Sequence, residues 1–139
     1  GFGGTNTHTL LRAAPAGQVV EAAEVKAPPR VAFLFTGTNS QHTGMGSNLY
    51  DTEESFRRAL DECAAVLDPL LPAPLLDIIF NKGDNHRGLL DQVHCSQPAI
   101  FAVEYALAQM WRARGVEPVL VLGHGIGEYA AAVTAGVMS

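Results

Sequence analysis

The sequence predicts an α/β fold in which a partial parallel sheet is flanked by helices. Two short apolar runs, at residues 31–35 and 119–122, are typical of strands buried inside a sheet. Two longer amphipathic stretches, at residues 51–67 and 97–114, are typical of helices. Because strands and helices alternate along the chain, we expect the two strands to lie parallel in one layer.

The first amphipathic stretch carries helix signals at both ends. Asp51 is expected to cap the helix, with Glu54 three residues on, and prolines at 69 and 72 end it. A shorter helix is expected over residues 74–80. One face of the first stretch is apolar and is expected to pack into the core: Phe56, Ala59, Leu60, Cys63 and Leu67.

The second amphipathic stretch is expected to begin at Gln97 and Pro98 and to end near Arg114. Proline is well placed in a first helical turn, and a glycine at 115 closes the helix. Glu104 falls on the polar side with Arg112, so we assign it no special role. The opposite face is apolar and includes Ile100, Val103 and Leu107.

Length and composition exclude several classes of protein. A chain of 139 residues corresponds to one domain or a piece of one. The net charge of −5 argues against a nucleic-acid-binding surface, which needs clustered basic residues. No apolar run reaches the roughly 18 residues of a membrane helix, and the first residues lack the features of a signal peptide, so we expect a cytoplasmic protein that crosses no membrane. Cys63 and Cys95 lack metal-type spacing, so we predict small buried side chains and no metal site.

Residues 119–139 follow the order of a nucleophile elbow. In the pattern G-x-S-x-G a strand leads through a tight turn into a helix, and the middle residue is the nucleophile. Here an apolar strand leads into a glycine-spaced turn at 123–127, and an alanine-rich helix follows to about Val137, with Gly136 near its end. The middle position is Gly125, which has no side chain. The frame is therefore present, and the nucleophile is absent.

A second turn, at residues 36–41, follows the first predicted strand and is polar. Turns at the carboxyl ends of strands are where open α/β sheets place their sites, and this one would present backbone N–H groups there. Taken alone, each of the two turns is also typical of an ordinary connection between a strand and a helix.

Residues 31–139 resemble the N-terminal part of a malonyl- or acyl-CoA:acyl carrier protein acyltransferase, specifically the acyltransferase domain of a type I modular polyketide synthase. The resemblance is carried in order by FLFTGTNSQHTGMG, by LYDTEESFRRALDECAAVLDPLL, by LLDQVHCSQPAIFAVEYALAQMWRARGVEP and by VLGHGIGEYAAAVTAGVMS. The family reads close to FTGQGSQ, YTQPALFA and GHSxGEYAAA in the first, third and fourth of these stretches. The resemblance implies a truncated acyltransferase core with a hydrolase-like fold.

Residues 1–10 resemble the GFGGTNAH loop at the C-terminal end of the ketosynthase domain in the same synthases. Residues 11–30 are rich in alanine, proline and valine and are predicted to be a linker. About twenty residues are too few for the folded linker domain that joins these two domains in the family. The resemblance nevertheless implies a ketosynthase domain and an acyl carrier protein as partners.

In this family a serine takes an acyl group from CoA, and the phosphopantetheine thiol of an acyl carrier protein then removes it. Both carriers are substrates, so no bound cofactor is expected. Gly125 occupies the serine position, and His124 matches the histidine before it. The backbone N–H groups of Thr38 and Ile126 occupy the oxyanion-hole positions, and Gln97 matches a pocket glutamine.

The sequence departs from the family in ways that bear on activity. Thr38 and Asn39 replace a Gln-Gly pair, at a turn where Asn39 tolerates left-handed backbone better than most residues. The carboxylate-binding arginine and the base histidine of the family match no residue up to Ser139. We therefore expect a chain that is inactive in acyl transfer, with ancestry closest to malonyl-type members.

Other interpretations stay open at this point. A non-catalytic module could still bind CoA or carrier protein, and binding without turnover would distinguish it. A nucleotide-binding unit is disfavoured, because Glu128 stands where the Rossmann pattern needs a glycine and would repel phosphate. Because the apolar helix faces suit a larger core, we also expect self-association.

Overall fold

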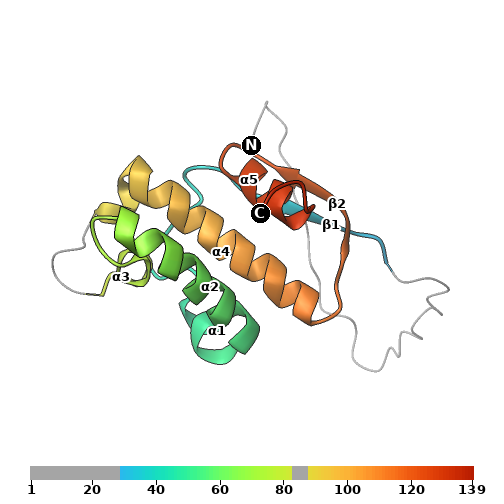
Figure 1. The fold of residues 1–139 in the computed structure, drawn as a ribbon, viewed down its shortest axis with the longest axis horizontal. Helices are drawn as coiled ribbons and strands as arrows, with labels where there is room; N and C mark the ends of the chain where they lie inside the picture. Colours follow the sequence, from blue (N-terminus) through green and yellow to red (C-terminus); the bar gives the residue numbers. More distant parts are fainter. Residues whose placement is uncertain (1–28, 83–87) are drawn as a thin grey trace, which may run out of the picture.

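The computed structural model describes residues 29–82 and 88–139. One long helix, α4 (Val93–Ala113), crosses the molecule, with helices α1, α2 and α3 on one side and the sheet and α5 on the other (Figure 1). The predicted ketosynthase-like tail at residues 1–10 lies outside the described residues, and so does nearly all of the predicted linker at 11–30.

The two predicted strands are present and parallel. β1 (Val31–Phe35) pairs with β2 (Pro118–Gly123), with Leu34 opposite Leu122 and an irregularity between Val31 and Ala32. The expectation that both strands are buried is wrong. Leu34 is 71% exposed and Leu122 is 62% exposed. Among the described residues helices cover only one face of this sheet, where Phe35 packs into a small cluster with residues of α4 and α5.

Four further helices complete the described fold. They are α1 (Ser47–Thr52), α2 (Glu54–Leu67), α3 (Leu75–Phe80) and α5 (Gly127–Thr134). Short 3-10 turns lie at Asp68–Leu70 and Leu89–Asp91. The short helix expected over residues 74–80 is therefore confirmed, whereas α5 ends three residues before the predicted Val137.

The cap predicted at Asp51 is wrong. Asp51 lies inside α1. The helix is interrupted at Glu53, whose backbone is extended with φ −116° and ψ 104°. Glu53 is the N-cap of α2, and no side chain caps that helix end. The break separates two helices where the sequence pattern indicated one. The Glu53 carboxylate instead pairs with Arg114, 2.6 Å away at the far end of α4.

Helix α4 begins four residues earlier than predicted, so Pro98 lies inside it rather than in its first turn. The N–H groups of Cys95 and Ser96 both bond to the Gln92 carbonyl at 2.8 Å and start the helix, and both of these residues are buried. Proline has no N–H to offer the carbonyl four residues before it. That carbonyl belongs to His94, an exposed residue of the first turn, where water can satisfy it.

The main hydrophobic core lies between α2, α3 and α4. The apolar face predicted for α2 is confirmed, because Phe56, Ala59 and Leu60 are buried and Cys63 and Leu67 pack against the core from its edge. Cys95 is fully buried, as expected of a small apolar side chain. The helical part of the chain therefore builds a core of its own, separate from the small cluster under the sheet.

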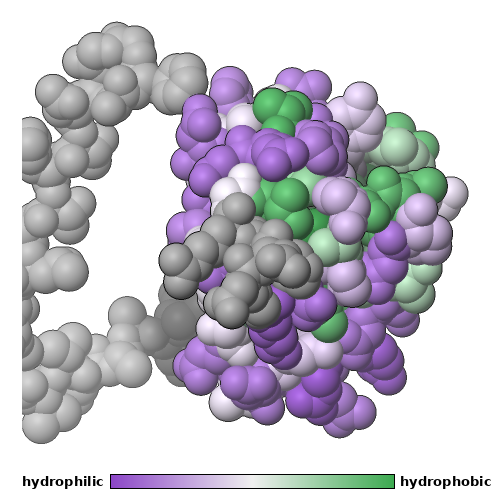
Figure 2. All heavy atoms as spheres, turned by 90° about the vertical axis from the view of Figure 1, so that its left-hand side faces the viewer, coloured by the Kyte–Doolittle hydropathy of each residue, from purple (hydrophilic) through white to green (hydrophobic). Residues whose placement is uncertain are grey.

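The surface is uneven in character. On the face drawn in Figure 2 hydrophilic residues predominate over much of the described surface, while hydrophobic residues gather toward one side. Large exposed apolar side chains include Leu34, Leu120 and Leu122 of the sheet. Within the described ranges no helix is both long and apolar enough to cross a membrane.

Helix α2 offers a matched pair of substitutions to test the packing. Phe56 is 0% exposed, so Phe56→Ala should lower the free energy of unfolding by about 3–5 kcal/mol, through lost burial and the cavity that remains. Val66 lies on the same helix and is 68% exposed, so Val66→Ala should change it by less than about 0.5 kcal/mol. Urea denaturation followed by circular dichroism measures both, and equal effects would contradict the described core.

Candidate functional site

The turns that follow the two strands meet at the carboxyl end of the sheet. The His124 N–H donates to the Phe35 carbonyl at 3.1 Å, which continues the pairing of the strands into the turns. Gly37 then packs directly against His124, because a Cβ on Gly37 would lie 2.7 Å from the His124 Cδ2 atom. The two turns that the sequence singled out are therefore in contact.

Glycines at two positions of the second turn are dictated by close packing. A Cβ on Gly123 would lie 2.3 Å from the Gly127 carbonyl oxygen, and a Cβ on Gly127 would lie 2.4 Å from the Thr36 carbonyl oxygen. Real Cβ atoms do not approach backbone oxygens this closely, so only hydrogen fits. These two glycines let α5 start against the end of β1.

Gly125 lies at the tip of the same turn and, unlike Gly123 and Gly127, is not required by close packing. It is exposed, its φ is +56°, and the nearest atom to a Cβ built there would be the Gly37 Cα at 4.0 Å. A side chain would therefore have room, and its only cost would be the left-handed backbone, about 1–2 kcal/mol. Residue 125 therefore lies beyond the carboxyl end of the sheet, in a position that could carry a side chain.

The turn after β1 is closed by its own polar groups. Ser40 donates its N–H and its hydroxyl to the Gly37 carbonyl, at 3.3 and 2.8 Å. Asn39 has φ +77° and donates its N–H to Gln41 Oε1 at 2.9 Å. The expectation that Asn39 tolerates a left-handed backbone is confirmed, and Thr38 is left exposed at the tip.

Several backbone N–H groups at these turns have no acceptor among the described residues, and those of Thr38 and Ile126 are among them. The N–H groups of Gly127, Glu128 and Tyr129 bond back to residues 124, 125 and 126 and start α5. In contrast, no acceptor within residues 29–82 and 88–139 takes the N–H of Thr38 or of Ile126. Such donors at the start of a helix and in an adjoining turn can bind a carbonyl oxygen that gains negative charge.

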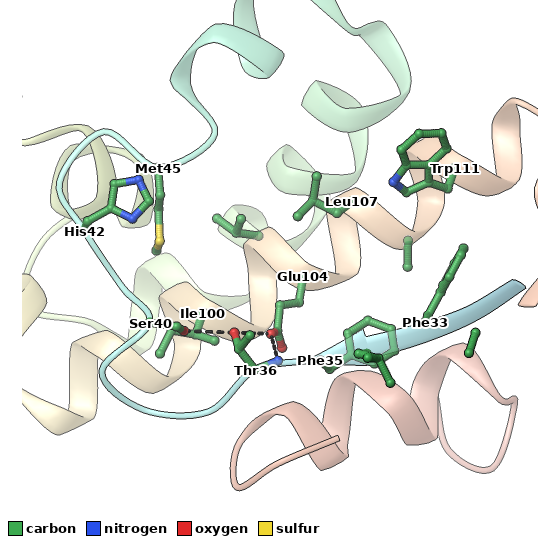
Figure 3. A pocket seen from close by; sticks show the side chains of 14 residues that line it. Phe33, Phe35, Thr36, Ser40, His42, Met45, Ile100, Glu104, Leu107 and Trp111 are labelled. Atoms are coloured by element: carbon green, nitrogen blue, oxygen red, sulfur yellow. Dashed lines mark hydrogen bonds between the residues drawn. The ribbon is translucent and has the colours of Figure 1, made fainter. Parts of the chain in front are cut away.

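Glu104 anchors the first turn to α4, so the expectation that it falls on the polar side of the helix with no special role is wrong. Its side chain is buried, with 8% of the residue exposed. Its Oε1 accepts the Thr36 N–H at 2.5 Å and the Thr36 hydroxyl at 2.8 Å, as the dashed lines in Figure 3 show. The Thr36 hydroxyl oxygen also lies 2.9 Å from that of Ser40, which links the carboxylate to the turn.

Burial of Glu104 leaves one of its two carboxylate oxygens without a hydrogen bond in the described part of the chain. Its second oxygen, Oε2, has no hydrogen-bond partner among the described residues. Desolvation raises the pKa of the carboxyl group, and the two hydrogen bonds from Thr36 oppose that rise. The helical period predicts that Glu104 lies on the polar side with Arg112, and so it misses the burial of this carboxylate. The burial has a signal in the sequence, because Glu104 is a single carboxylate among apolar neighbours on a helix.

The predicted site residues fall into two groups. Thr38, His124 and Gly125 line one open cavity at the carboxyl end of the sheet, together with residues 35–37, 39 and 40. Gln97 and Ile126 line a separate depression with Phe101 and Tyr129. The structure therefore brings the two turns together but places the side chains of Gln97 and Ile126 in the second depression.

Other chemistry is limited in the described part of the chain. It contains no group of three or more His, Cys, Asp or Glu side chains arranged to hold a metal ion. Burial, with a smaller effect of Glu62, raises the pKa of the Cys63 thiol to about 11, so it stays protonated at neutral pH. Cys95 is fully buried, and burial raises the pKa of its thiol as well.

Substitution of the two turn glycines should separate their roles. Gly127→Ala forces a Cβ against the Thr36 carbonyl, so we expect the turns to move apart and the His124 amide to exchange at least about tenfold faster. Gly125→Ala should leave that amide protected, because the added Cβ meets only open space. Hydrogen exchange measured by NMR distinguishes the two, and equal exchange in both variants would contradict the described contact.

Glu104 should make stability depend on pH. Because its pKa is raised in the folded chain, the folded state binds a proton more tightly than the unfolded state. The free energy of unfolding should therefore fall as pH rises from 4.5, the ordinary carboxyl value, through the raised folded pKa. Glu104→Gln keeps an oxygen acceptor for Thr36 and cannot ionise, so this part of the loss should disappear.

The measurement is urea unfolding of both proteins at several pH values between about 4 and 7. The difference in unfolding free energy between wild type and Glu104→Gln should shift against the wild type as pH rises. A constant difference across that range would show that the carboxyl group does not titrate with a raised pKa.

Comparison with known proteins places this fold and these turns in a family. Residues 32–139 match the family model described as acyl transferase domain. The orsellinic acid synthase armB of Armillaria mellea is 44% identical over 115 residues, which is 82% of this chain and 5% of that protein.

Solved structures agree with the sequence match. The acyltransferase domain from module 8 of the salinomycin polyketide synthase superposes with a TM-score of 0.73 at 42% identity, over 79% of this chain and 26% of that one. The acyl transferase domain of SpnD, in complex with 2-(pent-4-yn-1-yl)malonyl, gives 0.71 at 40% identity, over 82% and 26%. The chain thus spans about a quarter of these structures, and it belongs to the acyl transferase domain family, with polyketide synthases as its relatives.

Proposed function

We propose that this chain is part of an acyltransferase domain that meets acyl thioesters at the paired turns but forms no acyl-enzyme at residue 125. The substrates would be an acyl-CoA, with malonyl-CoA as the first candidate, and the phosphopantetheine arm of an acyl carrier protein. Membership of the family supports this assignment, and so does the complex of the SpnD domain with a substituted malonyl group, 2-(pent-4-yn-1-yl)malonyl. The absence of a side chain at Gly125 supports the second part of the proposal, that no acyl-enzyme forms there.

The position of residue 125 supports the proposal in geometric terms. It lies at the tip of a turn between a strand and a helix, with φ +56° and open space where a side chain would extend. A nucleophile there would stand beside the N–H groups of Thr38 and Ile126, which have no acceptor within the described residues. These donors would hold the thioester carbonyl oxygen, but glycine offers no atom to attack the carbonyl carbon.

Among the described residues, the cavity beside residue 125 offers no base to a nucleophile there. The residues that share its cavity carry no carboxylate, lysine or arginine. His124 is adjacent in sequence, but its ring lies toward Gly37, since the Cδ2 atom would be 2.7 Å from a Cβ there. A serine at 125 would therefore remain an alcohol, with no group of the described cavity placed to take its proton.

A second candidate is binding without turnover, and one observation favours it. The N–H groups of Thr38 and Ile126 belong to the backbone, so they do not depend on the side chain at 125. A thioester carbonyl of CoA or of a carrier protein could be held by them with no reaction following. Under this alternative the chain would serve a polyketide synthase as a scaffold, with a ketosynthase domain and a carrier protein as neighbours.

The test is intact-protein mass spectrometry after incubation with malonyl-CoA. We expect no malonyl adduct on the wild-type chain, and none on Gly125→Ser, because restoring the nucleophile restores neither a base nor its alignment. Gly125→Ala is the matched control, since it has the same backbone strain and no hydroxyl. It also reports any unspecific acylation of lysines.

A stoichiometric adduct on Gly125→Ser that peptide mapping assigns to residue 125, and that the alanine control lacks, would contradict the proposal. It would mean that a group outside the cavity described above acts as the base. Any hydrolysis of malonyl-CoA that leaves no adduct would agree with the proposal, because polarisation of the carbonyl by the backbone alone gives slow hydrolysis.

A further inference from the structure

Glu104 is a buried carboxylate in the middle of α4, and the proposed function gives it no part. A carboxylate is costly to bury, and an apolar side chain at this place would pack without that cost. Its hydrogen bonds lie between α4 and the turn after β1 (Figure 3), so they do not depend on what covers the surface of the chain. What these bonds hold in place is therefore the question that Glu104 raises.

The carboxylate fixes Thr36 in two ways. Its Oε1 accepts from the Thr36 N–H, which belongs to the backbone, and from the Thr36 hydroxyl at 2.8 Å, which belongs to the side chain. Both donors converge on one oxygen, so neither the backbone nor the hydroxyl of Thr36 can turn without breaking a bond. Thr36 is the residue directly before Gly37, so the start of the turn is held from α4.

Ser40 holds the other side of the turn. It donates its hydroxyl to the Gly37 carbonyl at 2.8 Å, and its oxygen lies 2.9 Å from that of Thr36. Each hydroxyl has a single proton, and a carboxylate accepts more strongly than a neutral hydroxyl. Glu104 takes the Thr36 proton, which leaves the Ser40 proton for the Gly37 carbonyl. A series of contacts from Glu104 through Thr36 and Ser40 thus ends on that carbonyl.

The Gly37 carbonyl and the Thr38 N–H belong to the same peptide group. That group is planar and trans, so its N–H points in the direction opposite to its C=O. The carbonyl is held inside the turn by Ser40, so the Thr38 N–H is directed out of it. His124 packs against Gly37 and limits movement of the same peptide. Whatever holds the Gly37 carbonyl therefore also sets the direction of the Thr38 N–H.

We propose that Glu104 is a positioning residue, which directs the Thr38 N–H toward the thioester carbonyl through Thr36 and Ser40. The inference rests on the proposed function for the identity of the ligand. Glu104 does not touch that ligand. Its contribution is to hold the donor in place before binding, so that binding does not have to order the turn. Loss of Glu104 should weaken the contact with the carbonyl oxygen and leave other contacts of the ligand unchanged.

Four variants separate this role from a merely structural one. Glu104→Met keeps the length of the side chain and removes the acceptor, whereas Glu104→Gln keeps an oxygen for Thr36. Ser40→Ala removes the last hydroxyl of the series. Ala106→Gly is the control for lost stability, because Ala106 is fully buried in the larger core on the same helix and makes no contact in the series. Urea unfolding establishes that each variant is folded.

NMR of the chain without ligand tests the positioning itself. In the Glu104→Met and Ser40→Ala variants we expect a changed ¹³C shift of the Gly37 carbonyl. We also expect the order parameter of the Thr38 N–H to fall from about 0.85, typical of rigid backbone, toward the values below about 0.6 of flexible backbone. Glu104→Gln and Ala106→Gly should resemble the wild-type chain. An unchanged Thr38 order parameter in Glu104→Met would overturn the proposal.

The effect on binding is measured as a ratio of two affinities. Calorimetry compares malonyl-CoA with S-(2-carboxyethyl)-CoA, the thioether in which a CH₂ group replaces the thioester carbonyl. We expect the wild-type chain, Glu104→Gln and Ala106→Gly to bind malonyl-CoA about three- to tenfold more tightly than the thioether. In Glu104→Met and Ser40→Ala the ratio should approach one. A general loss of stability weakens both ligands alike and leaves the ratio unchanged.

The outcomes distinguish failure of this inference from failure of the proposed function. A ratio of one in the wild-type chain would contradict both, because no donor would then hold the carbonyl. A wild-type preference for malonyl-CoA that Glu104→Met retains would overturn the positioning role alone. The double variant of Glu104→Met and Ser40→Ala should give the same ratio as either single variant, because the two residues act in series. Independent effects of the two changes would exclude that series.

Discussion

The close approach of two backbone turns at the end of the sheet is the constraint on which the rest of the site depends. The bond from the His124 N–H to the Phe35 carbonyl and the contact of Gly127 with the Thr36 carbonyl fix where α5 starts. The helix start in turn sets the direction of the Ile126 N–H, and the Glu104 carboxylate holds the other turn from α4. Without side-chain-free positions at 123 and 127 neither turn could reach the other.

Much of this fold could be predicted from the sequence, because local patterns determine it. Residue spacing predicts the apolar face of α2 and the parallel pair of strands. Backbone preference predicts that Asn39 can adopt a left-handed conformation. The features that could not be predicted depend on distant contacts. The break at Glu53 involves an ion pair with Arg114. The burial of Glu104 depends on its hydrogen bonds to Thr36, which lies 68 residues earlier in the chain, just after β1.

The candidate site was accessible to sequence reasoning only in part. The pattern of glycines predicted that the turn at 123–127 leads into a helix and that Gly125 stands at its tip. It could not separate the glycines that packing requires from the one with room for a side chain, because that difference lies in contacts with the other turn. Gln97 was matched by motif alone, and the structure places it in a different depression from Gly125.

The division of apolar contacts into two clusters has a consequence for the dynamics of the chain. The larger cluster joins α2, α3 and α4, whereas the buried part of the sheet cluster consists of Phe35, Ala108, Ala130 and Ala131. Regions with few buried apolar contacts open at lower free energy than the global unfolding of the protein. The turns and α5 therefore belong to a cooperative unit that can open while the helical core stays folded. Any ligand held by the turns would bind more weakly in proportion to the time that this unit spends open.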